Sequence, residues 1–410
     1  MRQSAYIAGV GMTRFGKHVT RGLKSLAIEA IEAAIKDAEI DAKRIEAAWM
    51  GTAAASVVTG QVCVPGQIVL RELGINKIPV VNVENACATA STAFQQACTL
   101  VTAGLYDVVL AVGFDKLYHE DKARTFSVFQ GSVDVEDPAA ITAYLERSAK
   151  THGLAFDPQE AGRKKSLFMD IYACMARDYM AESGATPQHF AMVSAKNSYH
   201  GSLNPRAQFQ EVLTAEEVLD APMIADPLTL PMCSPIGDGA AAAVIISKKM
   251  IKKLGIVDPV RVRSSVLVSG FDVEAEGQTV AGYAASLAYE TSGIGPSEID
   301  CVELHDASSP AELINYETLQ LCAKGEGPRL IEAGATRLGG SIPVNPSGGL
   351  NRKGHPIGAT GIAQIFELTE QLRGRATGRQ VEKAQVALAE NGGGFIGADS
   401  AAVVVTLLSD

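Results

Sequence analysis

The sequence predicts an α/β enzyme made of two similar halves, with a further domain inserted in the first half. Predicted strands and helices alternate along the chain, the order of these elements in the first half recurs in the second, and a charged, irregular segment lacks a counterpart. Such alternation is typical of mostly buried sheets with helices on their faces. The predicted boundaries are 1–116 and 236–255 for the first half, 117–235 for the inserted domain and 256–410 for the second half.

The internal duplication is visible in the order of the predicted elements. In the first half, an amphipathic helix at 25–40 is followed by a short strand, by VVNVENACATAS, where a strand turns into a helix, and by a strand at 106–114. In the second half, a helix at 281–294 is followed by the strand in CVELHDAS, by the glycine-rich NPSGGLNRKGHPIGATG leading into a helix, and by the strand AQVALA. Any α/β protein shows some alternation, but the shared order favours a duplication.

Composition and charge exclude several other classes of protein. The chain has 410 residues, of which 47 % are hydrophobic, which suits a packed enzyme and argues against disorder. The net charge of −10 gives no reason to expect nucleic acid or an anionic membrane as a partner. We find no signal peptide, membrane span or peroxisomal address, and therefore expect a soluble, cytoplasmic protein.

The seven cysteines do not suggest disulfides or zinc. Their number is odd and none lies in a CxxC pair, so neither a disulfide framework nor a structural zinc site is expected. His119 and His200 lack a metal-ligand pattern around them and are expected at the surface. GGGFIG at 392–397 matches the dinucleotide motif GxGxxG, but a strand follows it where that motif requires a helix.

Cys87 is the first candidate for chemistry. It lies in NACATAST, where a predicted apolar strand gives way to a helix. A cysteine at a helix N-terminus faces unpaired N–H groups and the positive end of the helix dipole, which favour the thiolate. The same N–H groups can bind an oxyanion. A buried cysteine among alanines is, however, more often a packing residue.

Two histidines are candidates to act with Cys87. His355 lies in a glycine-rich segment directly before Pro356, and a histidine held by such a rigid turn suits a general base. The alternative, a histidine that caps a loop, is disfavoured by the number of glycines. His305 ends a strand beside Asp306, a pattern that also occurs in simple strand caps. If the duplication is real, the strands before all three residues end at one cleft. A cysteine with two histidines there suits acyl transfer.

Four motifs together resemble the thiolase superfamily, in particular the branch that contains the thiolase domain of sterol carrier protein X and archaeal acetoacetyl-CoA thiolases. They are NACATAS, ADPLTLPMCSPIGDGAAAAV, ELHDAS and NPSGGLNRKGHPIGATG. The resemblance covers nearly the whole chain and implies a five-layered αβαβα thiolase fold with an inserted loop domain. It also implies an acyltransferase of acyl-CoA degradation, a homodimer or higher oligomer and, in some relatives, a small partner protein with a zinc ribbon and an OB fold.

The resemblance assigns roles to the candidate residues. Cys87 would be the nucleophile, His355 the base that activates it, and His305 a donor to the thioester oxygen in a first oxyanion hole. The backbone N–H groups of Cys87 and Gly393 would form a second hole. No permanently bound cofactor or metal is implied, and coenzyme A is a substrate.

Basic residues of the inserted domain are candidates for binding the phosphates of coenzyme A, because phosphate recognition needs positive charge. Each could equally be a solvated surface residue. The candidates are Arg163, Lys164, Lys165 and Lys196.

The sequence departs from the family in the second catalytic acid. Many thiolases have a second cysteine in a C-terminal CxG loop, and the sterol-carrier branch often has HDC in its strand motif. Here these segments read AENGGG and HDA, so Ala307 stands where a cysteine could act. Glu390, near the place of the loop cysteine, is the candidate acid, since burial would raise its pKa and keep it protonated.

The leading hypothesis is therefore CoA-dependent cleavage of a 3-oxoacyl-CoA through an acyl-Cys87 thioester. Two alternatives remain: a retro-aldolase on the same scaffold, or a non-catalytic acyl-CoA-binding subunit. Aldolases on this scaffold dispense with the cysteine, and the presence of Cys87 speaks against that role.

Overall fold

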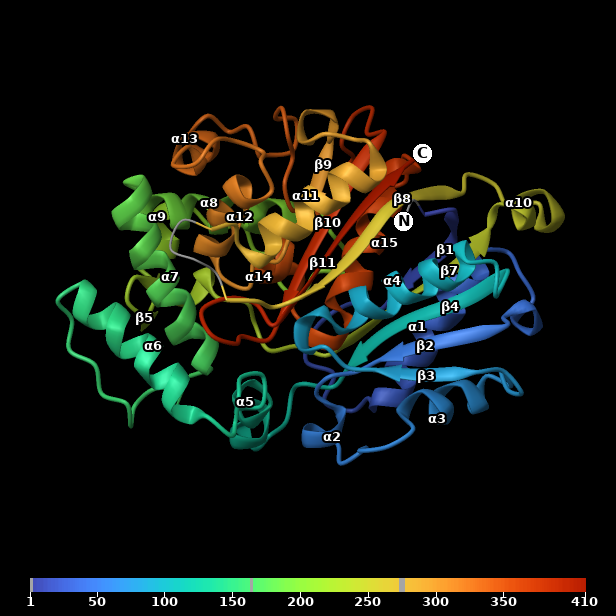
Figure 1. Cartoon of the computed structure of the whole chain (residues 1–410), viewed down its shortest axis with the longest axis horizontal. Coiled ribbons are helices and arrows are strands. Elements are labelled where there is room, and N and C mark those ends of the chain that lie inside the picture. Colours follow the sequence, from blue (N-terminus) through green and yellow to red (C-terminus); the bar gives the residue numbers. More distant parts are fainter. Residues whose placement is uncertain (1–2, 163–164, 273–276) are drawn as a thin grey trace.

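The structure, a computed structural model, describes residues 3–162, 165–272 and 277–410. A mixed nine-stranded sheet has the strand order β3-β2-β4-β7-β1-β8-β11-β10-β9, and β5 and β6 form a separate two-stranded sheet (Figure 1). The strands are β1 (Ala5–Met12), β2 (Ala47–Gly51), β3 (Val80–Val83), β4 (Val108–Asp115), β5 (Met223–Ala225), β6 (Leu228–Thr229), β7 (Gly239–Ser247), β8 (Val260–Ser269), β9 (Cys301–Glu303), β10 (Val386–Gly393) and β11 (Ala402–Ser409).

The large sheet consists of two similar halves. At their junction, β1 and β8 are paired at Tyr6–Arg261 and Ile7–Val260, a short contact compared with the pairing inside each half. In the first half, β2 is parallel to β4 and β4 antiparallel to β7. In the second half, β9 is parallel to β10 and β10 antiparallel to β11. The same pattern on both sides confirms the predicted α/β fold with an internal duplication.

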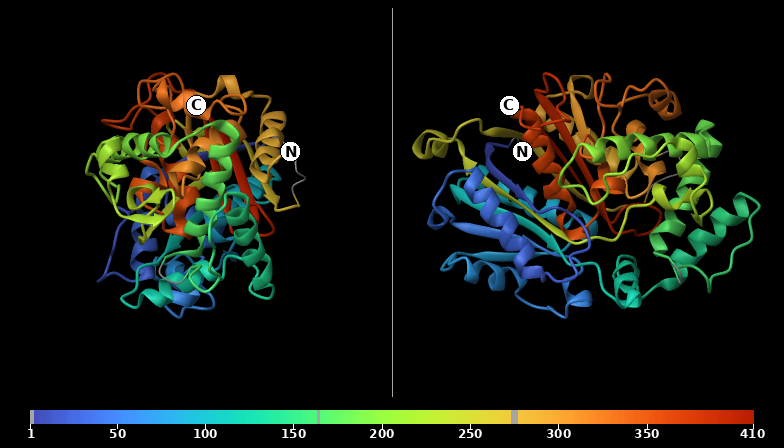
Figure 2. Two further views of the ribbon diagram at one scale, coloured as in Figure 1. Left: turned by 90° about the vertical axis from the view of Figure 1, so that its left-hand side faces the viewer. Right: turned by 180° about the vertical axis from the view of Figure 1, so that it is seen from behind.

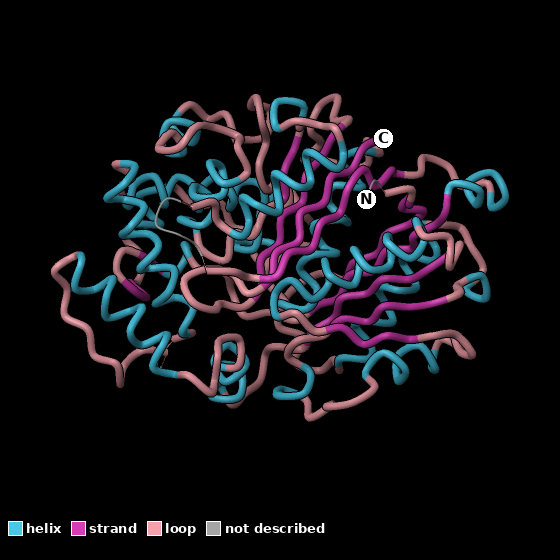
Figure 3. Tube along the Cα trace, viewed as in Figure 1, coloured by secondary structure: helices cyan, strands magenta, loops and turns pink. Residues whose placement is uncertain are grey.

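The helices recur in the same places and complete five layers (Figure 3). α4 (Thr89–Thr102) and α15 (Thr360–Leu372) lie side by side between the two halves of the sheet. α1 (Leu23–Asp37) covers the outer face of the first half, and α11 (Val280–Ser292) covers that of the second. Cys87 lies just before α4, and His355 lies a few residues before α15, so the position of the two middle helices determines where the site lies.

Buried apolar clusters hold the layers together. The middle cluster joins Phe94 of α4 and Phe366 of α15 to Trp49 of β2. An outer cluster joins Ile31 of α1 to Leu110 of β4. β4 and β7 are buried over nearly their whole length, which explains why VVLAVGFD and GAAAAVIIS show no alternation of polar and apolar residues.

The segment between β4 and β7 is mainly helical and lies at one end of the molecule (Figure 2). Residues of its helices share a buried cluster with the second half, such as Phe190 with Leu313. This segment is therefore connected to the first half and packed on the second, and its boundaries as a domain stay a prediction. Its helices are α5 (Lys122–Gln130), α6 (Pro138–Thr151), α7 (Leu167–Ser183), α8 (Pro187–Ser202) and α9 (Ala215–Leu219).

The remaining helices are short. None of the helices in the described part of the chain has the length and apolar character needed to cross a membrane. They are α2 (Ala55–Val58), α3 (Pro65–Glu72), α10 (Lys248–Leu254), α12 (Ser309–Thr318), α13 (Gly327–Glu332) and α14 (Gly349–Lys353).

Candidate active site

Cys87 lies in a single helical turn, η2 (Ala86–Ala88), that leads directly into α4. Ala86 has a left-handed φ of 49°, an uncommon conformation for a residue with a side chain. The turn directs the sulfur of Cys87, which is 8 % exposed, into a cavity of about 340 Å³. The structure therefore places Cys87 at the strand-to-helix turn that the sequence pattern predicts.

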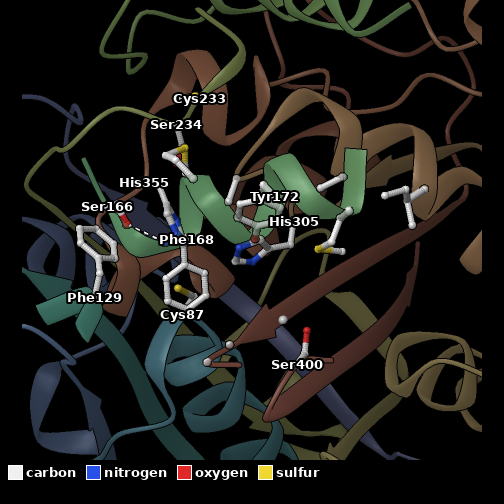
Figure 4. A pocket seen from close by; sticks show the side chains of 18 of the residues that line it. Cys87, Phe129, Ser166, Phe168, Tyr172, Cys233, Ser234, His305, His355 and Ser400 are labelled. Carbon is white, nitrogen blue, oxygen red and sulfur yellow. Dashed lines mark hydrogen bonds between the residues drawn. The ribbon is translucent and has the colours of Figure 1, made fainter. Parts of the chain in front are cut away.

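The structure brings the three predicted residues together (Figure 4). Cys87 Sγ and one ring nitrogen each of His305 and His355 lie within 4.8 Å of one another. The two imidazole rings are 5.1 Å apart between centroids and nearly perpendicular, at 83°. A thiolate sulfur and an imidazole nitrogen are also ligands that zinc prefers. A metal ion bound here would occupy the same three atoms that acyl transfer needs as nucleophile, base and hydrogen-bond donor.

The hydrogen bonds of His355 leave one nitrogen free to accept a proton. Its Nδ1 lies 2.7 Å from Thr360 Oγ1, and the Thr360 hydroxyl donates in turn to the Pro356 carbonyl at 3.1 Å. Nδ1 therefore carries the hydrogen, and Nε2 has the free lone pair that a general base requires. Burial, with help from His305 and Lys353, holds the pKa of His355 well below its usual value, so the ring is neutral.

His305 has the complementary arrangement. The amide of Asn391 donates to its Nδ1 at 2.9 Å, and the same Asn391 side chain accepts from Ser91 at 2.8 Å. Nε2 of His305 then carries a hydrogen and can donate to an oxyanion. Burial lowers the pKa of His305 to about 4, so this ring is neutral as well. Asn391 lies outside every motif that the sequence singles out, and its only signal is its place next to Glu390 on β10.

The electrostatics of Cys87 differ from the sequence expectation. Burial, followed by the carboxylates of Asp115 and Glu84, raises the pKa of the thiol to about 12, while the N–H groups of Gly394 and of Cys87 itself lower it. The favourable backbone groups do not outweigh burial, so the resting cysteine is a thiol. Its proton must therefore move to a base during attack rather than before it.

The oxyanion role of Gly393 stays a prediction, and the glycine N–H that the structure places at Cys87 belongs to the next residue. The N–H of Gly394 faces the Cys87 sulfur. Gly393 instead pairs with Ala402 in the sheet, and a Cβ on Gly393 would lie 2.5 Å from the Asn85 carbonyl oxygen. Gly393 thus permits β10 to approach the cysteine turn, and the N–H at the sulfur comes from the residue after it.

Glu390 lines the same cavity as Cys87. Its Oε2 accepts hydrogen bonds from the His305 backbone N–H at 2.9 Å and from Asn315 Nδ2 at 3.3 Å. Burial raises the pKa of Glu390 to about 7, which leaves a proton available near neutral pH.

Asp115, which no sequence motif marks as a site residue, connects the two halves of the site. It ends β4 and accepts hydrogen bonds from Thr52 Oγ1 at 2.6 Å, from the Ala54 N–H at 2.9 Å and from the Gly358 N–H at 2.6 Å. Gly358 belongs to the turn η5 (Ile357–Ala359), which comes shortly after His355 in the chain. Asp115 therefore holds in place the loop that carries the base.

The predicted phosphate-binding residues differ in where they lie in the structure. Lys165 lines the cavity, and its Nζ bonds to Asp170 Oδ1 at 2.8 Å and to the Ile224 carbonyl at 3.0 Å. Arg163 and Lys164 lie outside the described residues.

Lys196 requires a correction. Its ammonium is fully buried in an ion pair with Glu312 and bonds to the Val344 carbonyl at 3.0 Å, which leaves no face for a phosphate.

The expectation that His200 lies at the surface is also wrong, because its ring is buried and bonds to the Asn345 carbonyl and the Leu338 N–H. His119 is half-buried and accepts from the Asp121 N–H.

The chain is similar to known proteins over nearly its whole length. Residues 5–249 match the family model for the thiolase N-terminal domain, and residues 272–406 match the thiolase C-terminal domain-like model. Sterol carrier protein 2 of Bos taurus is 38 % identical over 99 % of this chain and 72 % of its own length. The acetyl-CoA acetyltransferase of Methanothermobacter thermautotrophicus is 37 % identical over 96 % of this chain and 97 % of its own. The solved Ltp2–ChsH2(DUF35) aldolase has a TM-score of 0.76 and 25 % identity, covering 98 % of this chain and 97 % of that one.

Proposed function

Since this chain belongs to the thiolase family and is a thiolase-type acyltransferase, we propose that it cleaves a 3-oxoacyl-CoA with coenzyme A through a thioester on Cys87. The observation that carries the proposal is the convergence of Cys87, His305 and His355 within 4.8 Å in one cavity. A nucleophile, a base with a free lone pair and an N–H donor are the groups that acyl transfer requires.

In the first half-reaction, Cys87 Sγ bonds to C3 of the substrate as its proton passes to Nε2 of His355. The oxyanion at C3 accepts from the backbone N–H groups of Cys87 and Gly394. The C2–C3 bond then breaks, and its electron pair forms a thioester enolate whose oxygen accepts from His305. Glu390 protonates C2. The fragment that contains C1 and C2 then leaves as its coenzyme A thioester, and the remainder of the acyl chain stays on Cys87.

In the second half-reaction, coenzyme A removes the acyl group. Its thiol gives a proton to the Glu390 carboxylate, and its sulfur attacks the thioester carbonyl on Cys87. The Cys87 sulfur leaves and recovers its proton from His355. Every group returns to its starting protonation state, as a catalytic cycle requires.

The direct test is mass spectrometry of the intact protein after incubation with a 3-oxoacyl-CoA in the absence of free coenzyme A. A mass increase equal to one acyl group, located on Cys87 and removed by coenzyme A, is the expected result. A protein that cleaves the substrate without gaining mass would instead follow an aldolase-like route.

We predict that Glu390→Gln slows the cleavage of a 3-oxoacyl-CoA much more than it slows the acylation of Cys87 by a simple acyl-CoA. The glutamine carbonyl can still accept from the His305 N–H, so the strand ends keep their positions, but the amide has no acidic proton. Acylation of Cys87 by a simple acyl-CoA should stay within about threefold, whereas cleavage of a 3-oxoacyl-CoA should fall about 10²-fold or more, the usual contribution of a general acid. Stopped-flow or quenched assays of each step measure the difference.

The pH dependence provides the control for Glu390. A carboxyl with a pKa of about 7 holds its proton below pH 7 and loses it above. Relative to simple acylation, cleavage by the wild type should therefore decline as pH rises through 7, and Glu390→Gln should not show this decline. Equal loss of both steps would mean that Glu390 is structural, and no loss would leave bound water as the proton source.

We further propose that Arg163, Lys164 and Lys165 bind a phosphate of coenzyme A. Lys165 is on the cavity wall, and Asp170 is its ion-pair partner. Reversing the three charges should raise the KM for coenzyme A about tenfold, since a charge-assisted hydrogen bond contributes roughly 1.5–3 kcal/mol. High salt should reduce the difference. Lys324→Glu, at an exposed lysine outside the cavity, is the matched control, and an unchanged KM would remove this cluster from the site.

Oligomeric state, partner and location complete the proposal. β3 is an edge strand on which Val81 is 42 % exposed, and such an edge supports a homodimer. The DUF35 component named in the similar aldolase supports a small partner protein. Coenzyme A is proposed as a substrate rather than a resident cofactor. A role in acyl-CoA degradation follows the family resemblance, and a location in the cytoplasm stays a separate proposal. Light scattering of the purified protein, with and without co-purified proteins, tests the assembly.

A further inference from the structure

The cavity beside Cys87 has one aromatic wall, formed by Phe129, Phe168 and Tyr172 (Figure 4). The ring centroids of Phe129 and Phe168 are 6.4 Å apart, and those of Phe168 and Tyr172 are also 6.4 Å apart. Phe168 and Tyr172 are an i, i+4 pair on α7, so both rings lie on the same face of that helix. The three rings form a continuous row, called the aromatic wall below.

The aromatic wall borders the position of the transferred acyl group rather than only the path of coenzyme A. Phe129 packs against the buried cluster that contains Cys87 and Ile357. At the other end of the row, Tyr172 is partly buried and lines the same cavity as Cys87. An acyl group bonded to Sγ therefore lies against this wall.

Further apolar side chains line the cavity, alongside the polar residues of the catalytic site, and the cavity is large enough for a ring. Its volume, about 340 Å³, falls in the range of roughly 300–1,000 Å³ typical of pockets for drug-sized ligands. Thioether and aliphatic side chains adapt their shape to a ring and make favourable contacts with its edge. An acetyl group would leave most of the aromatic wall in contact with water. The apolar residues that line the other sides are Met169, Met175, Ile224, Leu230, Ile236 and Ile314.

We propose that the acyl group carried by Cys87 ends in an aromatic ring, and that the aromatic wall selects such a group over a short aliphatic one. The inference rests on the proposed function, because it names the acyl group that Cys87 carries. Ring pairs prefer tilted and edge-to-face arrangements, and the wall already holds its own rings at 61° and 46°, which leaves their edges and faces open to a further ring.

The bond changes are those of the proposed reaction. Cys87 Sγ bonds to the keto carbon next to the ring, the C2–C3 bond breaks, and the two-carbon fragment leaves as acetyl-CoA. Coenzyme A then takes the aroyl group from Cys87. The test compares two substrates that differ only in the group transferred: 3-oxo-3-phenylpropanoyl-CoA, which delivers a benzoyl group, and acetoacetyl-CoA, which delivers an acetyl group.

The wild type is expected to favour the phenyl substrate in kcat/KM by about tenfold or more, since burial of a ring and its aromatic contacts add to the apolar area removed from water. Phe168→Ala should lower the ratio of the two kcat/KM values by about tenfold, and Phe168→Leu, which keeps apolar bulk, by less. Tyr199→Ala, which removes an aromatic side chain that is 50 % exposed on α8, is the matched control and should leave the ratio unchanged.

Measurement of the intact mass after acylation of Cys87 distinguishes a failure of the aromatic-wall proposal from a failure of the thioester mechanism. If acetyl and benzoyl groups both load onto Cys87 but the wild type shows no preference, or if Phe168→Ala leaves the ratio unchanged, the role of the aromatic wall is overturned and the thioester mechanism stands. If neither group loads onto Cys87, the proposed function fails and this inference fails with it.

Discussion

Replacement of Cys87 by alanine is expected to abolish the acyl-enzyme and to lower kcat by about 10⁴-fold or more, the scale of loss seen when a covalent nucleophile is removed. The reason is that neither neighbouring histidine can hold the acyl group in its place: His355 is positioned as the base and His305 as a donor. Intact mass after incubation with an acyl-CoA should show one added acyl group in the wild type and none in Cys87→Ala.

Cys233 provides a matched control, because it is a second cysteine on the wall of the same cavity. Cys233→Ala should still gain one acyl group. Acylation by an acyl-CoA is a better probe than general alkylation, since Cys63 is exposed and would react with an alkylating reagent while the buried Cys87 is still a thiol. Near-normal turnover by Cys87→Ala would contradict the covalent mechanism and favour the retro-aldolase alternative.

The sequence was sufficient to predict the layers and the three central residues. Strand and helix periods are local, and the duplication repeats them in the same order, so the corresponding helices α4 and α15 could be expected together. Cys87 and His355 each precede one of these helices, and His305 follows a short strand. Their convergence therefore follows from topology, because equivalent ends of a duplicated structure meet at one place.

What the sequence could not predict depends on contacts between distant segments. Lys196 is a candidate for binding phosphate in the sequence, but its partner is Glu312, on a different helix more than a hundred residues away. The choice between Gly393 and Gly394 depends on where β10 stops pairing with β11. The sign of the Cys87 pKa shift depends on how deeply the turn is buried, and no local motif reports burial.

Removal of His355 is expected to have the second-largest effect and a distinctive pH dependence. His355→Ala should slow acylation of Cys87 by about 10³-fold at neutral pH, within the range usual for a general base. In the wild type, the pKa of His355 is held well below 6.5, so the ring is already in its basic form at neutral pH and the rate should change little above it. Without this base, the thiol must ionise by itself, and its pKa is about 12.

The acylation rate of His355→Ala should therefore rise about tenfold per pH unit between pH 7 and 9.5, because the thiolate fraction rises in that proportion below the thiol pKa. His305→Ala is the comparison: loss of an oxyanion donor typically costs about 10²–10³-fold, without a steep pH dependence. Single-turnover acylation followed by intact mass across this pH range distinguishes the two variants. A flat profile for His355→Ala would show that another group takes the Cys87 proton, and a loss under about twofold in His305→Ala, far below the usual cost, would make that histidine a strand cap.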